Sequence, residues 1–144
     1  MTPNKTAARR LLEEAWSGEL DVVHEVVAPD ASPPHEGAGF APGPDGWRQE
    51  IMFIRAGLPD LVVKVREMIE EGDAVAASWH SSGTHTGTLF GIPPTGRSVE
   101  MDGLTMFHLR DGRLVKHHTL EDRVALMTQI GVLAEFGQEG APNS

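Results

Sequence analysis

The sequence predicts an α+β fold, with helices in the first half of the chain and an antiparallel meander of strands in the second. Apolar residues recur with a period near 3.6 up to residue 58 and with a period of two after residue 61. Because no helical segment separates the later strands, the βαβ alternation of a Rossmann-type nucleotide site is not expected. A chain of 144 residues is expected to form one domain over residues 1–144.

Three amphipathic helices are expected before residue 60. Gly18 ends the first, Pro29 follows the second and Pro59 closes the third. Their apolar faces are formed by Ala8, Leu11, Leu12, Ala15 and Trp16, then Leu20, Val22, Val23, Val26 and Val27, then Trp47, Ile51, Ile54 and Leu58. Residues 29–46 are rich in proline and glycine, so they are expected to form a long ordered loop or lid.

Strands are expected in the second half, where apolar residues alternate from residue 61 to 65 and from 75 to 79, on either side of a turn at 71–73. Two further strands are expected on either side of residues 91–96, and the pair Asp111-Gly112 turns the chain into a last strand. The polar tail at 138–144 is expected to be frayed.

Composition excludes several classes of function. A net charge of −9 without a local cluster of lysine or arginine argues against a nucleic-acid partner. The chain has no cysteine, which removes disulfides, thiolate nucleophiles and cysteine-bound metals. No segment approaches the roughly 18 apolar residues of a membrane span, and no signal peptide is evident. We therefore expect no membrane partner and a cytoplasmic location.

The histidines do not suggest a metal site. His117 and His118 are adjacent on a predicted strand and point to opposite faces, while His80 and His85 are an odd number of positions apart. The G-x-S-x-G motif of a serine nucleophile and a P-loop are also missing from the sequence.

The length of the last hairpin loop decides which side chains share a face. With a two-residue loop, His108 lies opposite Val115 and shares its face with His117 and Glu121. With a three-residue loop, His108 lies opposite Leu114 instead. We favour the three-residue loop, because it forms one apolar surface of Leu104, Met106, Leu114 and Leu120 in which His108, His118 and Asp122 are set.

Ordered motifs run through the second half: T-H-T-G at 84–87, G-I-P-P-T-G-R at 91–97, D-G-R-L at 111–114, and Asp122 nine residues before the glycine of Q-I-G at 129–131. Over roughly residues 74–133 the sequence thereby resembles the SnoaL-like polyketide cyclases. The resemblance implies a cone-shaped fold shared with nuclear transport factor 2, in which a curved antiparallel sheet wraps around the N-terminal helices and one apolar pocket. It also implies a homodimer paired through the open sheet face, and a reaction without cofactor or metal.

The resemblance also implies roles for individual residues. Asp122 matches the family's general acid/base, although a residue directly before a helix is also typical of an N-cap. His108 matches a position in the family's site, and His118 stands where many members have tryptophan. His118 is therefore either a second proton-transfer group or part of the pocket wall.

The remaining candidates are substrate contacts. Trp79 matches an aromatic residue of the family and is expected to line the pocket with Leu104, Met106 and Leu120. His35 and Phe40 are expected in the lid at 29–46. Asp102 lies on the strand parity of His108, either as an inward acid or pointing to water.

The leading hypothesis is a cofactor-independent cyclase, or a related lyase or isomerase, acting on a hydrophobic polyketide-like carbonyl compound. An apolar pocket raises the pKa of a carboxyl group, which suits proton abstraction for an intramolecular aldol ring closure. One alternative is epoxide hydrolysis or epoxide-opening cyclisation with Asp102 and Asp122 as the two carboxylates. The other is a noncatalytic small-molecule-binding dimer, which is favoured if Asp122 caps a helix and turns away from the pocket.

Overall fold

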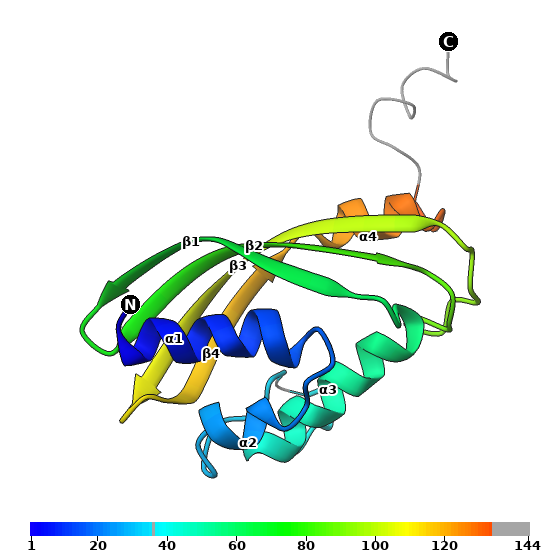
Figure 1. Cartoon of the computed structure of the whole chain (residues 1–144). Helices are drawn as coiled ribbons and strands as arrows, with labels where there is room; N and C mark the ends of the chain where they lie inside the picture. Colours follow the sequence, from blue (N-terminus) through cyan, green and yellow to red (C-terminus); the bar gives the residue numbers. More distant parts are fainter. Residues whose placement is uncertain (36, 134–144) are drawn as a thin grey trace.

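Four antiparallel strands form one open, curved sheet in the computed structural model, which describes residues 1–35 and 37–133 (Figure 1). The strands β1 (Val62–Glu71), β2 (Ala74–Thr84), β3 (Ser98–Arg110) and β4 (Arg113–Glu121) are neighbours in chain order. The prediction of an antiparallel meander after the N-terminal helices is confirmed. The predicted tail at 138–144 lies outside the described residues.

Helices cover one face of this sheet (Figure 1). They are α1 (Pro3–Arg9), which continues into the π-helical segment η1 (Arg10–Ala15), then α2 (Val22–Val26) and α3 (Gly43–Gly57). A short helix, α4 (Arg123–Gln129), follows β4. The three helical regions predicted before residue 60 are therefore confirmed, with boundaries shifted by a few residues. No helix among the described residues is both long and apolar enough to cross a lipid bilayer.

The core lies between the helices and the concave face of the sheet. Its fully buried side chains come from both layers and include Leu11, Val23, Ile51, Val75, Phe107 and Leu114. Gly103 in β3 is required by this packing, because a Cβ atom there would lie 2.1 Å from Cζ2 of Trp79 on the paired strand. The absence of a side chain lets the indole ring lie across β3.

The strand predicted before residue 91 is wrong. Strand β2 runs to Thr84, and residues 85–97 form a loop with an isolated bridge between Leu89 and Ile92. The backbone N–H of Gly87 donates to the carbonyl of Gly57, and a Cβ atom at Gly87 would lie 1.9 Å from the carbonyl oxygen of Ala56. This close approach ties the segment to the end of α3 instead of to the sheet.

The hairpin between β3 and β4 has a two-residue loop, so the favoured three-residue loop is also wrong. Asp111 and Gly112 both have positive φ, 53° and 75°, as a tight hairpin of this kind requires. A β-bulge then changes the register: Leu109 pairs with Leu114, but His108 pairs with Lys116. Val115 is the extra residue. Beyond it Phe107 pairs with His117 and Met106 with His118, so His108 and His118 do share a face, because of the bulge and not of the loop.

Candidate active site

An apolar pocket of about 560 Å³ lies between the concave face of the sheet and the helices. Aromatic side chains from every layer contribute to its wall, among them Trp16, Trp47, Phe53, Trp79 and Phe107. Phe40, from the segment before α3, and Phe90, from the 85–97 loop, also line it. The two rings flank Phe53, with ring centroids 6.4 Å and 6.0 Å from it.

Polar side chains gather in one part of this lining: His35, Glu50, His117, Glu121 and Arg123. Glu50 projects from α3 and is only 6% exposed, and its Oε2 contacts Nδ1 of His35. Burial raises the pKa of the Glu50 carboxyl group above its ordinary value; the positive charge of His35 opposes this shift and the negative charge of Glu121 adds to it. A carboxyl group whose pKa is raised in this way is suited both to take up a proton and to return it.

His117 lies next to this pair on β4. Its ring centroid is 4.6 Å from that of Trp47, and burial, assisted by the charges of His35 and His118, lowers the pKa of His117 to about 4. The imidazole is therefore neutral near pH 7, where it can donate one hydrogen bond and accept another.

Arg123, at the start of α4, contacts both the end of β4 and the 85–97 loop. Nη2 of Arg123 lies 2.9 Å from Oε1 of Glu121, and Cζ of Arg123 lies 4.8 Å from the ring centroid of Phe90. This contact of a guanidinium group with an aromatic face holds the loop against the start of α4. Glu121 thereby keeps a positively charged partner beside Glu50.

Three of the residues expected from the sequence as substrate contacts lie in the pocket lining. They are His35, Phe40 and Trp79. Trp79 is 7% exposed and forms part of the core as well as of the wall. Contact of these three residues with a substrate stays a prediction.

Five others lie on the opposite, outer face of the sheet. Leu104, Met106 and Leu120 are 51%, 42% and 79% exposed, so the prediction that they line the pocket is wrong. His108 and His118 share that outer face, with ring centroids 6.5 Å apart. The physical reason is that the helices cover the face of the sheet that carries Phe107 and His117. We favoured the opposite face, which carries Met106 and His118.

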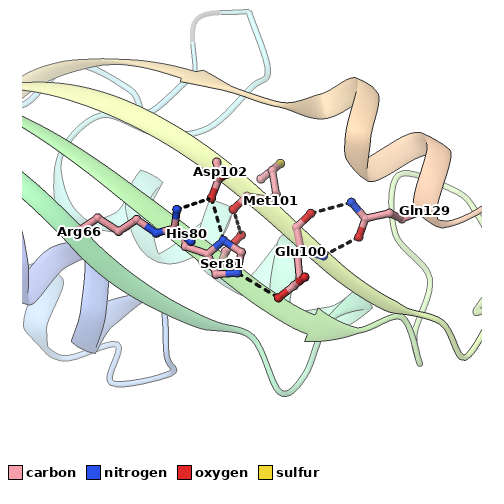
Figure 2. Close-up of polar contacts among 7 residues, drawn as sticks. All are labelled: Arg66, His80, Ser81, Glu100, Met101, Asp102 and Gln129. Atoms are coloured by element: carbon pink, nitrogen blue, oxygen red, sulfur yellow. Dashed lines mark hydrogen bonds and ion pairs between the residues drawn. The ribbon is translucent and has the colours of Figure 1, made fainter. Parts of the chain in front are cut away.

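Asp102 also points to water, among charged neighbours on the outer face (Figure 2). Its Oδ1 lies 2.7 Å from Nδ1 of His80 and 3.8 Å from Nη1 of Arg66, and Glu100 contacts the other ring nitrogen of His80 at 3.2 Å. The hydrogen bond from His80 is the main reason why the pKa of Asp102 lies below its ordinary value. Of the two orientations left open for Asp102, the structure therefore shows the outward one.

Asp122 is the N-cap of α4. Its Oδ1 accepts a hydrogen bond of 2.9 Å from the backbone N–H of Ala125, and the residue is exposed. Neither Asp122 nor Asp102 belongs to the pocket lining, so the pair of carboxylates that we expected for epoxide chemistry is not in the pocket. The N-cap interpretation of Asp122 is confirmed, and its role as general acid/base stays a prediction that this geometry does not favour.

Sequence reasoning missed the ionisable residues of the pocket other than His35, namely Glu50, His117, Glu121 and Arg123. The sequence carried a signal for Glu50, because it lies three residues after Trp47 and directly before Ile51, on the stripe that was recognised as buried. His117 and Glu121 were grouped together only in the arrangement that we did not favour. Within residues 1–35 and 37–133 no three histidine or acidic side chains are close enough to hold a metal ion.

A helix-covered, curved antiparallel sheet that encloses one apolar pocket defines a class of small α+β proteins. Within that class, the family model of the SnoaL-like polyketide cyclases matches residues 6–130. The chain therefore belongs to the SnoaL-like polyketide cyclase family and is an enzyme of that type.

Individual relatives agree with this assignment. The chain is 29% identical to the nogalonic acid methyl ester cyclase of Streptomyces nogalater, over 80% of this chain and 87% of that protein. It is 25% identical to the aklanonic acid methyl ester cyclase DauD of a Streptomyces species (strain C5), over 91% and 83% of the two chains. The crystal structure of wild-type IdmH from Streptomyces antibioticus is 36% identical, with a TM-score of 0.74 and 92% and 100% coverage. The predicted cone-shaped α+β fold is thereby confirmed.

Proposed function

We propose that this enzyme closes a ring in a hydrophobic polyketide ester by an intramolecular aldol reaction, with Glu50 as general acid/base. Two of the relatives named above are cyclases of nogalonic acid methyl ester and aklanonic acid methyl ester, and the largely apolar wall of the pocket suits a flat aromatic substrate of that kind. The observation that supports the role of Glu50 best is the burial of its carboxyl group in the pocket wall, held by His35.

The proposed reaction begins with proton transfer. Glu50 removes a proton from a carbon atom that neighbours a carbonyl group, and the electron pair of the broken C–H bond forms an enolate. The enolate carbon attacks a second carbonyl carbon of the same molecule, which forms the new C–C bond and leaves an alkoxide. The protonated Glu50 returns its proton to that alkoxide. The reaction transfers protons and forms one C–C bond within the same molecule, so it consumes no oxidant or reductant.

The neighbours of Glu50 have supporting roles in this proposal. His35 contacts Oε2 and orients the carboxylate, while no described residue forms a hydrogen bond with Oε1. The free oxygen is the one that would take the proton. Neutral His117 is placed to hydrogen-bond a substrate oxygen, and the contact of Arg123 with Phe90 helps to keep water out of the pocket.

The direct test compares Glu50→Gln with Asp122→Asn, using nogalonic acid methyl ester and aklanonic acid methyl ester as substrates. Glutamine keeps the shape and the contact with His35 but cannot carry the proton, so single-turnover rates should fall by about 10²–10⁴-fold at unchanged substrate binding. Asp122→Asn should change the rate by less than about tenfold. In the wild type, the acid limb of the pH–rate profile should lie above pH 4.5, the ordinary value for glutamate.

Each alternative has its own signature in this experiment. If Asp122→Asn abolishes turnover while Glu50→Gln retains it, the base is Asp122, as the resemblance implied. If the wild-type protein binds both esters and converts neither of them, the proposed substrate class is refuted.

We also propose that the outer face of the sheet pairs with a second copy of the chain. That face exposes Leu104, Met106 and Leu120 side by side on β3 and β4, where Leu104 pairs with Leu120. A homodimer would cover these apolar side chains. Light scattering should give a dimer mass for the wild type and a monomer mass for Met106→Glu. Met52→Glu is the matched control, because Met52 is 52% exposed on α3 and away from this face.

A further inference from the structure

A chain of hydrogen bonds crosses the sheet in the wall of the pocket. Nε1 of Trp79 in β2 lies 2.9 Å from Oγ1 of Thr105 in β3, and that oxygen lies 2.9 Å from Oγ1 of Thr119 in β4. Thr105 and Thr119 are register partners, and all three residues line the pocket. We call these three residues the hydroxyl chain.

The direction of the hydroxyl chain follows from what each group can donate. An indole N–H can only donate, so Oγ1 of Thr105 must accept from Trp79. Thr105 is 2% exposed, and its own proton needs an acceptor. Among the described residues, the one other partner of this oxygen is Oγ1 of Thr119. Thr105 therefore donates to Thr119, since the opposite direction would leave its proton buried without an acceptor.

Thr119 is consequently left with one proton and no described protein acceptor for it. It is only partly buried, and it lines the pocket on the same strand and face as His117 and Glu121. Each of these neighbours is two residues away, roughly 6–7 Å along the strand. An unused hydroxyl donor in an apolar wall, beside the polar side chains that include Glu50, is placed to meet a substrate oxygen.

We propose that Thr119 donates a hydrogen bond to the substrate carbonyl oxygen that becomes the enolate oxygen when Glu50 removes the neighbouring proton. This inference rests on the proposed function and adds the residue that stabilises the developing negative charge. A donor oriented in advance in an apolar site needs no rearrangement during the reaction, which is why such groups have large effects. Trp79 acts through Thr105 as a positioning residue, because its N–H occupies one lone pair of Oγ1 of Thr105 and so orients that hydroxyl group towards Thr119.

The binding test uses 9-fluorenone, a flat aromatic ketone, and fluorene, which lacks the oxygen. In the wild type, the infrared C=O stretching band of bound fluorenone should lie at lower frequency than in cyclohexane. Thr119→Val removes the hydroxyl group at nearly constant shape, so the shift should disappear and the Kd for fluorenone should rise about 3- to 10-fold. The Kd for fluorene should not change, and Thr119→Ser should restore the shift. Trp79→Phe should weaken the shift, because Oγ1 of Thr105 then loses the donor that orients it and can accept the proton of Thr119 instead.

The kinetic test uses nogalonic acid methyl ester. Thr119→Val should lower kcat by about 10²-fold with little change in KM, as for the loss of one oxyanion donor, and Thr119→Ser should recover most of it. The inference is overturned if wild-type protein fails to bind fluorenone, if the bound ketone shows no shift, or if Thr119→Val keeps the shift. The two proposals can also fail separately. If Thr119→Val loses the shift of the C=O band while Glu50→Gln keeps full turnover, the proposed role of Glu50 is refuted and Thr119 still donates a hydrogen bond to the carbonyl oxygen.

Discussion

The pocket and the outer face of the sheet contain the same types of titratable residue in opposite electrostatic situations. In the pocket, burial raises the pKa of Glu50 and lowers that of His117 to about 4, so the neutral form of each is favoured. On the outer face, the hydrogen bond between His80 and Asp102 raises the pKa of the histidine and lowers that of the aspartate, so the charged form of each is favoured. A carboxyl group whose pKa is raised by burial is suited to take up and return a proton, and for this reason the proposed proton transfer is placed in the pocket.

The largest expected difference between the two faces concerns packing. Phe107 and Met106 are adjacent on β3, but Phe107 is 1% exposed in the core and Met106 is 42% exposed on the outer face. Phe107→Ala should lower the free energy of unfolding by about 3–5 kcal/mol, and Met106→Ala by less than about 1 kcal/mol. Urea unfolding of both variants, at a dilution where the protein is monomeric, measures the difference. Equal losses would mean that the two faces are not distinguished by burial.

The second prediction concerns the pH dependence of stability. The folded-state pKa of His117 is lowered from 6.5 to about 4. The contribution of neutral His117 to the free energy of unfolding is therefore fully present above pH 6.5 and is lost as the pH falls towards 4. The loss is at most about 3 kcal/mol, and less to the extent that water reaches the ring. His117→Gln should flatten the decline in Tm between pH 6.5 and 4. Glu50 changes stability in the opposite direction over the same range, so the informative quantity is the difference between wild type and variant at each pH.

A smaller effect is expected at the junction of β4 and α4. Asp122→Ala should cost about 0.5–2 kcal/mol, because it removes the acceptor of the Ala125 N–H, whereas asparagine can still cap the helix. Thermal unfolding of both variants separates capping from charge. Equal destabilisation by alanine and asparagine would show that the charge of Asp122 matters more than its hydrogen bond.

The smallest effect is expected from the ion pairs of the outer face. The pKa of His80 is raised chiefly by its hydrogen bond with Asp102, so its stabilising contribution is present below pH 6.5 and is lost as the pH rises through the folded-state value. The difference in Tm between wild type and His80→Gln should be small at acidic pH, vanish at alkaline pH and shrink in high salt. A difference that persists at alkaline pH or in high salt would point to packing instead.

The order of the elements could be predicted from the sequence, because apolar periodicity reports directly on helices and strands. The sequence could not predict which side of the sheet faces the pocket. Three features that the alternation of apolar and polar residues does not report decide it. The bulge at Val115 changes the parity of β4, the helices select the face that they cover, and the outer face carries Leu104 and Leu120, whose apolar character resembles that of a core. Glu50 was missed for a related reason, since periodicity identifies a buried stripe but assigns no role to an acid within it.

The bulge at Val115 also bears on how site residues are transferred between related sequences. Strand β4 and the residue that follows it carry two polar sets of opposite parity, one of His117, Thr119 and Glu121 and one of His118 and Asp122. The register decides which set faces inward. A sequence alignment matches positions in a column and contains no information about strand register. Two family members can therefore agree at an aligned aspartate while only one of them presents that side chain to its substrate. For this family, the equivalence of catalytic residues should be assigned on superposed strands, and a bulge that appears or disappears during evolution can replace one pocket wall by another without a substitution in either set.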